Sequence, residues 1–106
     1  MKPMKKTNRT LKAILKFVAE EFSVPVRKIM SRKRNEAFTI PRHVVFYIAR
    51  NLPGYRLSYD TIGDFFGLHH SAIVHGCSSV QDRIDTDAEF AYRVGLLLGD
   101  CISRML

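Results

Sequence analysis

Apolar side chains recur at helical spacing in the first third of the chain. Residues 10–22 predict an amphipathic helix, with Asn8 or Thr10 as N-cap, because apolar positions are separated by three and four residues: Leu11, Ile14, Leu15, Val18, Ala19 and Phe22. Pro25 can open a second, short helix that ends near Ser31, since proline is favoured in the first turn of a helix. Two helices are therefore expected before residue 32.

The next segment changes from basic to polar and then to apolar. Residues 32–40 predict a loop, in which Pro41 holds Ile40 in an extended conformation. Pro41 then begins a third helix, which ends at the Leu-Pro-Gly sequence of residues 52–54. Residues 44–49 are apolar without interruption, which indicates a central helix buried on nearly every side.

Three further helices are predicted in the second half of the chain. Ser58 is a candidate N-cap for a fourth helix over about 58–66, and a fifth covers about 69–84. Thr86 and Glu89 have capping-box spacing for a last helix. Its apolar stripe consists of Phe90, Val94, Leu97, Leu98, Cys101 and Met105. No segment has a convincing strand pattern, so the fold class is all-α with about six helices.

The stretch over about 58–84 has the pattern of a helix-turn-helix. Gly67 can adopt the positive φ of a tight turn, and Gly63 removes a side chain where two helices approach closely. The crease between the helices would be filled by Ile62, Phe66, Leu68 and Ile73. The second helix then exposes a face of short polar side chains that fits a DNA major groove: His69, His70, Ser71, Ala72 and His75.

Length and charge limit the possible organisation and partners. A chain of 106 residues allows one domain, and we expect a basic flexible arm over residues 1–9 followed by a single helical domain over 10–106. The net charge is +7, with +10 in residues 1–50 and −3 in residues 51–106. Two basic clusters account for this asymmetry: Lys2, Lys5, Lys6 and Arg9, then Arg27, Lys28, Arg32, Lys33 and Arg34. Such clusters favour a nucleic acid as partner.

Several other classes of protein do not fit the sequence. No apolar run approaches the roughly 18 residues that a membrane span needs, and charged residues interrupt the stretch after the basic N-terminus, unlike a signal peptide. Two cysteines make no disulfide framework, which favours the reducing cytoplasm. The absence of a glycine-rich phosphate loop argues against ATP hydrolysis by that device.

Three alternatives remain beside DNA binding. A metal site is disfavoured, because His70 and His75 are five residues apart and do not share a helix face. Catalytic pairs such as Cys77 with His75, or Asp64 with His70, are supported by composition only. The basic first helix could instead bind a membrane surface or a protein partner, although its apolar face is also needed for the core.

Three stretches resemble the C-terminal DNA-binding domain of the bacterial replication initiator DnaA, over roughly residues 14–98. Residues 17–34, from Phe-Val-Ala-Glu-Glu-Phe to Ser-Arg-Lys-Arg, are similar to the family's opening helix and basic loop. Residues 40–50 are similar to its "RPRQ…A…LA(K/R)" helix. Residues 62–77, with Ile-Gly-Asp-Phe-Phe-Gly and His-Ser-Ala-Ile-Val-His-Gly-Cys, are similar to its "IG..FGGRDHTTVLHAC" signature. The resemblance implies a Trp-repressor-like helical architecture.

The resemblance also implies roles for individual residues. Arg34 matches an arginine that enters the minor groove, and Arg42 and Arg50 match basic residues that touch phosphates. The family contacts bases through an Asp-His-Thr-Thr run, where this chain has residues 69–72. The candidate DNA-binding residues are therefore Arg32, Lys33, Arg34, Arg42, His43, Arg50, Ser58, Tyr59, His69, His70, Ser71, Ala72 and His75.

The recognition segment departs from the family pattern. Of the four residues of the run, only His70 is identical to the family pattern. His69 replaces the acid, and Ala72 lacks the hydroxyl of the second threonine. Just before the run, Leu68 stands where the family has arginine, and one glycine that precedes this arginine in the family is missing. A target different from the family's A/T-rich box is therefore expected. The resemblance covers no ATPase region, which implies a DNA-binding module without nucleotide, metal or other cofactor. We expect a non-enzymatic monomer that binds double-stranded DNA in the cytoplasm, at the nucleoid.

Overall fold

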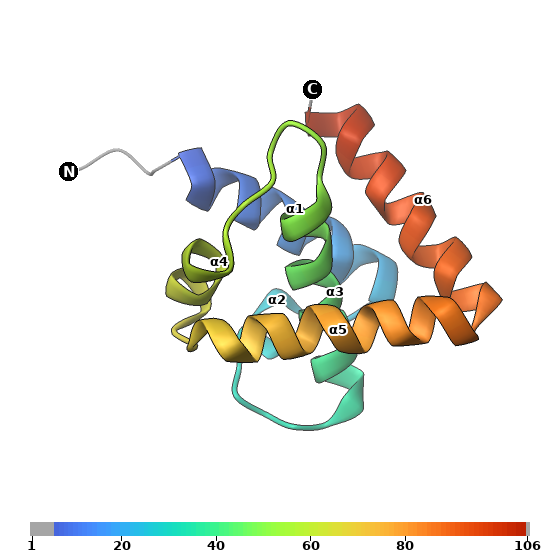
Figure 1. Ribbon diagram of the computed structural model, residues 1–106, viewed down its shortest axis with the longest axis horizontal. Helices are drawn as coiled ribbons and strands as arrows, with labels where there is room; N and C mark the ends of the chain where they lie inside the picture. The colour runs from blue at the N-terminus through green and yellow to red at the C-terminus, as the bar shows by residue number, and fades with distance from the viewer. Residues whose placement is uncertain (1–5, 106) are drawn as a thin grey trace.

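Six α-helices form the part of the chain that the computed structural model describes, residues 6–105 (Figure 1). They are α1 (Lys6–Phe22), α2 (Val26–Ile29), α3 (Glu36–Asn51), α4 (Tyr59–Phe66), α5 (His70–Thr86) and α6 (Ala88–Met105). No strand occurs in this range. The all-α prediction with six helices is confirmed.

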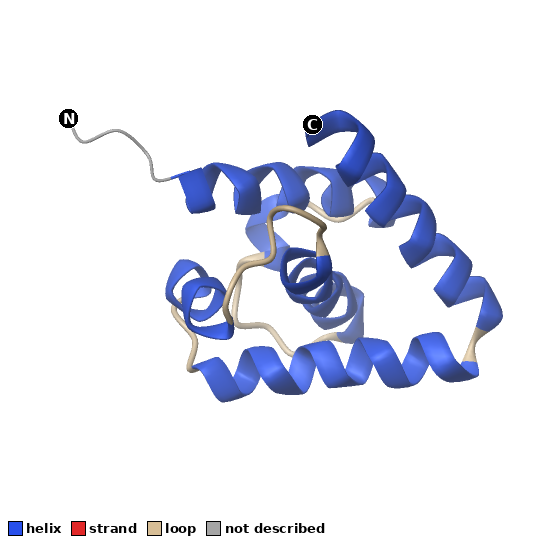
Figure 2. Ribbon diagram, turned by 45° about the horizontal axis from the view of Figure 1, so that its top comes forward, coloured by secondary structure: helices blue, strands red, loops and turns tan. Residues whose placement is uncertain are grey.

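Helix α3 runs through the middle of the molecule, and α1, α4, α5 and α6 surround it (Figure 2). Its residues Val44, Val45, Ile48 and Ala49 are fully buried and Phe46 is 1% exposed. Each large aliphatic or aromatic side chain removed from water in this way contributes roughly 1.5–3 kcal/mol. The uninterrupted apolar run that predicted a central helix therefore forms the core on which the other helices are placed.

The start of α3 differs from the prediction, which placed a loop over 32–40 and the first turn at Pro41. The helix begins at Glu36, because the side chain of Asn35 accepts a hydrogen bond from the Ala37 amide at 2.9 Å and caps it. Pro41 lies inside the helix and is buried. Its missing amide leaves the Ala37 carbonyl without an i+4 donor, and Ala37 is exposed, so water can satisfy that carbonyl.

Three other helix ends are shifted from their predicted positions. Helix α1 begins at Lys6, so residues 6–9 of the predicted arm are helical, while residues 1–5 lie outside the described range. Helix α2 spans four residues, with Pro25 as its N-cap. Helix α6 is capped by Asp87, whose carboxylate accepts the Phe90 amide at 3.1 Å. The capping box predicted at Thr86 is therefore wrong by one residue.

Candidate nucleic-acid interface

The two helices of the predicted helix-turn-helix are α4 and α5. The Ser58 side chain caps α4 by accepting the Thr61 amide at 3.1 Å, as the sequence predicts. Gly67 ends α4 with φ of +68° in the left-handed region, which favours glycine. A Cβ on Gly63 would lie 2.6 Å from the Leu68 carbonyl oxygen, so only glycine allows the turn to pass this close.

The crease between α4 and α5 is filled as predicted. Ile62 and Ile73 are fully buried, Phe66 is buried, and Leu68 is half-buried against the core. The Phe66 ring meets Phe46 of α3 edge-to-face, with centroids 4.9 Å apart. This contact fixes the helix-turn-helix on the central helix, so α5 is presented at a defined angle.

Gly76 allows α5 to pack closely against α3, a role that was not predicted from the sequence. A Cβ on Gly76 would lie 2.7 Å from the Phe46 ring and 2.9 Å from the His43 ring. His43 is consequently half-buried between the two helices, and its desolvation, with smaller contributions from His75 and Arg42, lowers its pKa. One turn further along, Tyr47 donates its hydroxyl to Gln81 at 3.1 Å.

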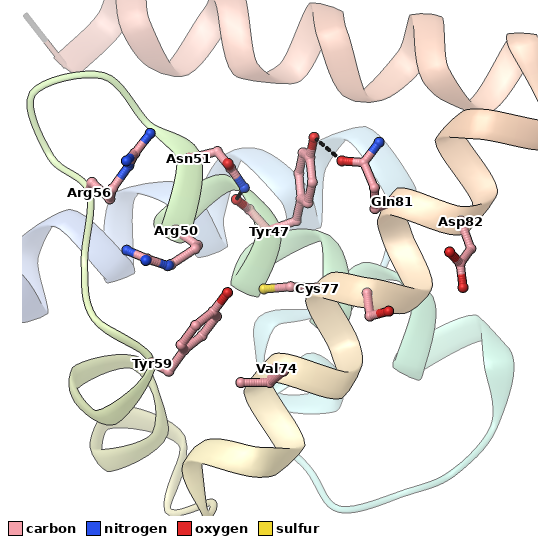
Figure 3. Close-up of a pocket in the computed structure, with 10 residues that line it drawn as sticks. Tyr47, Arg50, Asn51, Arg56, Tyr59, Val74, Cys77, Gln81 and Asp82 are labelled. Carbon is pink, nitrogen blue, oxygen red and sulfur yellow. Dashed lines mark hydrogen bonds between the residues drawn. The ribbon is translucent and has the colours of Figure 1, made fainter.

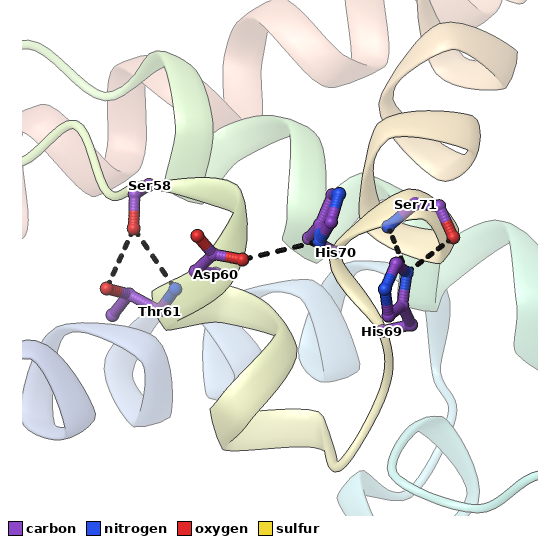
Figure 4. Close-up of polar contacts among 6 residues, drawn as sticks. All are labelled: Ser58, Asp60, Thr61, His69, His70 and Ser71. Atoms are coloured by element: carbon purple, nitrogen blue, oxygen red, sulfur yellow. Dashed lines mark hydrogen bonds and ion pairs between the residues drawn. The ribbon is translucent and has the colours of Figure 1, made fainter.

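Polar contacts at the N-terminal end of α5 orient the side chains of His69 and Ser71 (Figure 4). His69 is the N-cap, and its Nδ1 accepts the Ser71 amide at 3.2 Å. Because an amide can only donate, Nδ1 holds a lone pair and the neutral ring carries its proton on Nε2. The Ser71 hydroxyl, 2.8 Å from the same Nδ1, therefore donates to it and keeps its oxygen lone pairs. The segment thus presents one ring N–H donor and one hydroxyl acceptor.

The other predicted residues of α5 lie beside this pair. His70 stacks against His69 with ring centroids 4.2 Å apart, and its Nδ1 lies 3.4 Å from the Asp60 carboxylate of α4. His75 is exposed and Ala72 is half-buried. The first turn of α5 contains no acidic residue of its own, but the Asp60 carboxylate of α4 lies beside it. A polyanion at this end of α5 would be attracted by the helix dipole and repelled by Asp60.

The basic loop between α2 and α3 is fastened to the helix-turn-helix. Arg32 donates from Nη2 to the Gly67 carbonyl at 2.7 Å, so its guanidinium holds the turn. Arg34 is exposed and lines, with Arg32, Phe66 and Leu68, a depression of about 270 Å³ next to that turn. The exposed loop and the N-terminal end of α5 are thus held in a fixed relation.

Arg42 is buried, whereas the phosphate contact that the family resemblance implies needs an exposed guanidinium. Its side chain is 8% exposed and donates to three carbonyls: Ile29 at 2.6 Å, Lys33 at 3.2 Å and Lys28 at 3.3 Å. The guanidinium thereby satisfies the last turn of α2 and fixes the path of the basic loop. Its phosphate contact stays a prediction.

The ammonium groups of Lys28, on α2, and Lys33, in the basic loop, lie close enough to interact. The neighbouring Lys33, by a hydrogen bond first and charge repulsion second, lowers the pKa of Lys28. Both belong to one of the basic clusters found in the sequence. A phosphate placed between them would offset the repulsion.

Arg50 lies at the other side of α5, in a groove of about 430 Å³ (Figure 3). Its guanidinium stacks 4.7 Å above the Tyr59 ring and donates to the Leu57 carbonyl at 3.3 Å. Arg56, from the loop before α4, lines the same groove and is exposed. Arg56 and Asp60 were not predicted as site residues, because Arg56 lies outside the dense basic clusters and Asp60 is an acid within the helix-turn-helix.

Three further observations on the described residues concern metal binding, membrane spans and cysteine reactivity. Within residues 6–105, no three His, Cys, Asp or Glu side chains are grouped to hold a metal ion. Over the same range, no helix has both the length and the apolar character of a membrane span. The Cys77 thiol is buried, and desolvation raises its pKa to about 11, so it is a poor nucleophile.

Comparison with known proteins gives a consistent result. Residues 11–80 match the family described as bacterial dnaA protein helix-turn-helix. The chromosomal replication initiator protein DnaA of Geotalea daltonii is 37% identical over 81 residues, 76% of this chain and 18% of that protein. The same protein of Onion yellows phytoplasma is 31% identical over 88 residues, 83% of this chain and 17% of its own length. The chain thus spans less than a fifth of these relatives.

Two solved structures share the fold. A crystal structure of a DNA replication initiation factor superimposes with a TM-score of 0.83 and 26% identity, over 95% of this chain and 30% of that one. A replication initiator DnaA bound to AMPPCP and single-stranded DNA gives 0.82 and 25%, with the same coverage. The arrangement of all six helices is therefore shared with these larger proteins.

Proposed function

The chain belongs to the bacterial DnaA helix-turn-helix family, and from that premise we propose that it binds double-stranded DNA sequence-specifically. The N-terminal end of α5 enters the major groove and the basic loop enters the adjacent minor groove. The observation that carries the proposal is the exposed donor and acceptor pair of His69 and Ser71, held on a rigid helix-turn-helix beside the basic loop. Regulation at a replication origin or promoter, without ATP hydrolysis, is the proposed role, exercised at the nucleoid.

The hydrogen-bond donor and acceptor at the start of α5 suggest which base edges this helix would bind in the major groove. The Nε2–H of His69 is a donor, which suits the N7 or O6 acceptors of guanine. The Ser71 oxygen is an acceptor, which suits an exocyclic amino group of adenine or cytosine. The methyl group of Ala72 can contact the methyl group of thymine. The carboxylate of an aspartate at residue 69, as in the family, could only accept hydrogen bonds. Because His69 offers a donor instead, we propose a target site different from the A/T-rich box of the family.

Contacts to the DNA backbone would fix the register of these base contacts. Arg50 and Arg56 flank the groove beside α5, and the capped end of α4 at Ser58 and Tyr59 adjoins it. Phosphates bind at arginines and at helix N-termini, where amides and the helix dipole attract anions. These residues are therefore proposed to contact phosphates on one side of the major groove.

The alternative of a membrane-binding first helix has less support. The apolar residues Leu11, Ile14 and Val18 of α1 are fully buried, and α1 packs on α3 and α6. An interfacial helix needs such a face free for the bilayer. The face that would enter a membrane is instead part of the core.

Replacing Arg34 with alanine is expected to weaken binding about tenfold on a duplex with an A-tract, and clearly less on a G/C-rich duplex. A narrow A-tract minor groove has a stronger negative potential, which a groove-inserted arginine senses. Lys12→Ala, at an exposed position of α1, is the matched control and should change both affinities less than about twofold. Fluorescence anisotropy on the two duplexes measures this. Equal losses on both duplexes would make Arg34 an ordinary phosphate contact.

A further inference from the structure

The outward face of α6 exposes large apolar side chains. Tyr92 is 69% exposed and Leu96 is 55% exposed. They lie one helical turn apart, and Gly99 continues the row, with open space where a Cβ would stand. The buried side of α6, with Phe90, Val94, Leu97 and Cys101, points the other way into the core. The row is thus not needed for the fold of one chain.

This face is remote from the proposed DNA interface. Figure 1 shows α6 at one end of the long axis of the molecule, with α4 and the N-terminal end of α5 at the other. A partner bound along α6 would leave the helix-turn-helix and the basic loop uncovered. The row on α6 can therefore be occupied while DNA is bound.

The charges beside the row balance each other. Glu89 and Asp100 are exposed acids of α6, and Arg93 and Arg104 are its bases, so the helix has no net charge on a chain of +7. Arg93 bonds to Glu21 through Nε and Nη2, which leaves its Nη1 hydrogens available. A second copy of this basic chain would meet less repulsion here than at the basic loop.

The order of these charges along α6 would let two antiparallel copies of the helix pair acids with bases. If two copies of α6 lie antiparallel with Leu96 beside a twofold axis, Glu89 faces Arg104 of the partner subunit. In the same register Arg93 faces Asp100 of the partner subunit, and the twofold axis repeats both pairs. In an isologous dimer both subunits use the same surface patch, so that patch must be complementary to itself in this way.

We propose that this face of α6 is the interface of a twofold symmetric dimer of the chain. In that register the two Leu96 side chains meet beside the axis, and Tyr92 packs against Gly99 of the partner subunit, where the missing Cβ lets the two helices approach closely. One pair of helices gives a small interface, so the expected Kd is on the order of 10 µM. The sequence analysis predicts a monomer, and under this proposal the monomer is the main species only below this concentration. The dimer carries two helix-turn-helix elements and can hold two DNA sites.

Sedimentation over a range of protein concentrations tests the dimer without DNA, so its outcome is independent of the proposed function. Leu96→Glu should raise the Kd at least tenfold, because it places two carboxylates at the axis. Val26→Glu is the matched control, since Val26 is 40% exposed on α2, and it should leave the Kd unchanged. A wild-type chain that stays monomeric well above the expected Kd, or a dimer that survives Leu96→Glu, would overturn the proposal.

A charge exchange tests the antiparallel register. Glu89→Arg should weaken the dimer, because it places two like charges opposite each other. Glu89→Arg combined with Arg104→Glu should restore most of the wild-type Kd, since the pair is re-formed with its signs reversed. A double variant as weak as the single one would contradict this register.

Discussion

Raising the salt concentration from about 50 to about 200 mM is expected to weaken binding to duplex DNA by about a thousandfold. Each phosphate that a basic side chain neutralises releases a condensed counterion, which adds about 0.9 to the slope of log affinity against log salt. Six basic side chains lie on α2, in the loop that follows it and in the groove beside α5: Arg27, Lys28, Lys33, Arg34, Arg50 and Arg56. About six phosphate contacts give a slope near −5.

Anisotropy titrations of one labelled duplex at four or more salt concentrations provide this slope. Arg56→Ala should make the slope shallower by about 0.9, since it removes one contact. Lys16→Ala, at an exposed position of α1, should leave it unchanged. A wild-type slope close to zero would contradict binding through the phosphate backbone.

Replacing Gly63 with alanine is expected to destabilise the chain by about 3 kcal/mol, at the upper end for an overpacked site. The added Cβ would stand 2.6 Å from the Leu68 carbonyl oxygen, which belongs to the backbone of the turn and has no rotamer by which to move away. The turn would have to open, and the angle between α4 and α5 would change with it. Base recognition should therefore be lost even where the variant still folds.

Gly95→Ala in α6 is the matched control. A Cβ there has nothing within 4 Å, so the substitution should stabilise the chain by about 0.5–1 kcal/mol through helix propensity alone. Urea unfolding followed by circular dichroism gives both values. If Gly63→Ala is as stable as the wild type, the close approach of the turn is not a constraint on the fold.

The helices were predictable where side-chain periodicity alone sets them, whereas their ends were predictable only at α4. Ser58 and Gly67 carry signals of their own, a capping hydroxyl and a residue without Cβ, and both have their predicted places. The start of α3 was missed because Pro41 is the stronger local signal for a first turn. Asn35 overrides it, since its side chain caps the helix six residues before the proline.

The candidate site was predictable as a set of residues and less so as a set of contacts. Sequence spacing placed His69 at the start of the recognition segment, but only the structure shows that its Nδ1 is used as a cap, which leaves Nε2 as the ring nitrogen that can meet a base. Charge density selected Arg32, and the family resemblance selected Arg42, without distinction from Arg34. Tertiary carbonyls that the sequence does not reveal bind the first two and leave Arg34 exposed.

The central claim, that the N-terminal end of α5 selects a DNA sequence, is tested most directly by selecting bound duplexes from a random pool. The wild type and His69→Asp/Ala72→Thr are compared at fixed salt and pH. Aspartate is also a good N-cap, so the variant keeps the helix, but it replaces a donor by an acceptor. The wild type should enrich one motif. The variant should enrich a motif changed at the base pairs beside residue 69, with preferences shifted by about 1–3 kcal/mol. No enriched motif for either protein, or the same motif for both, would contradict the claim.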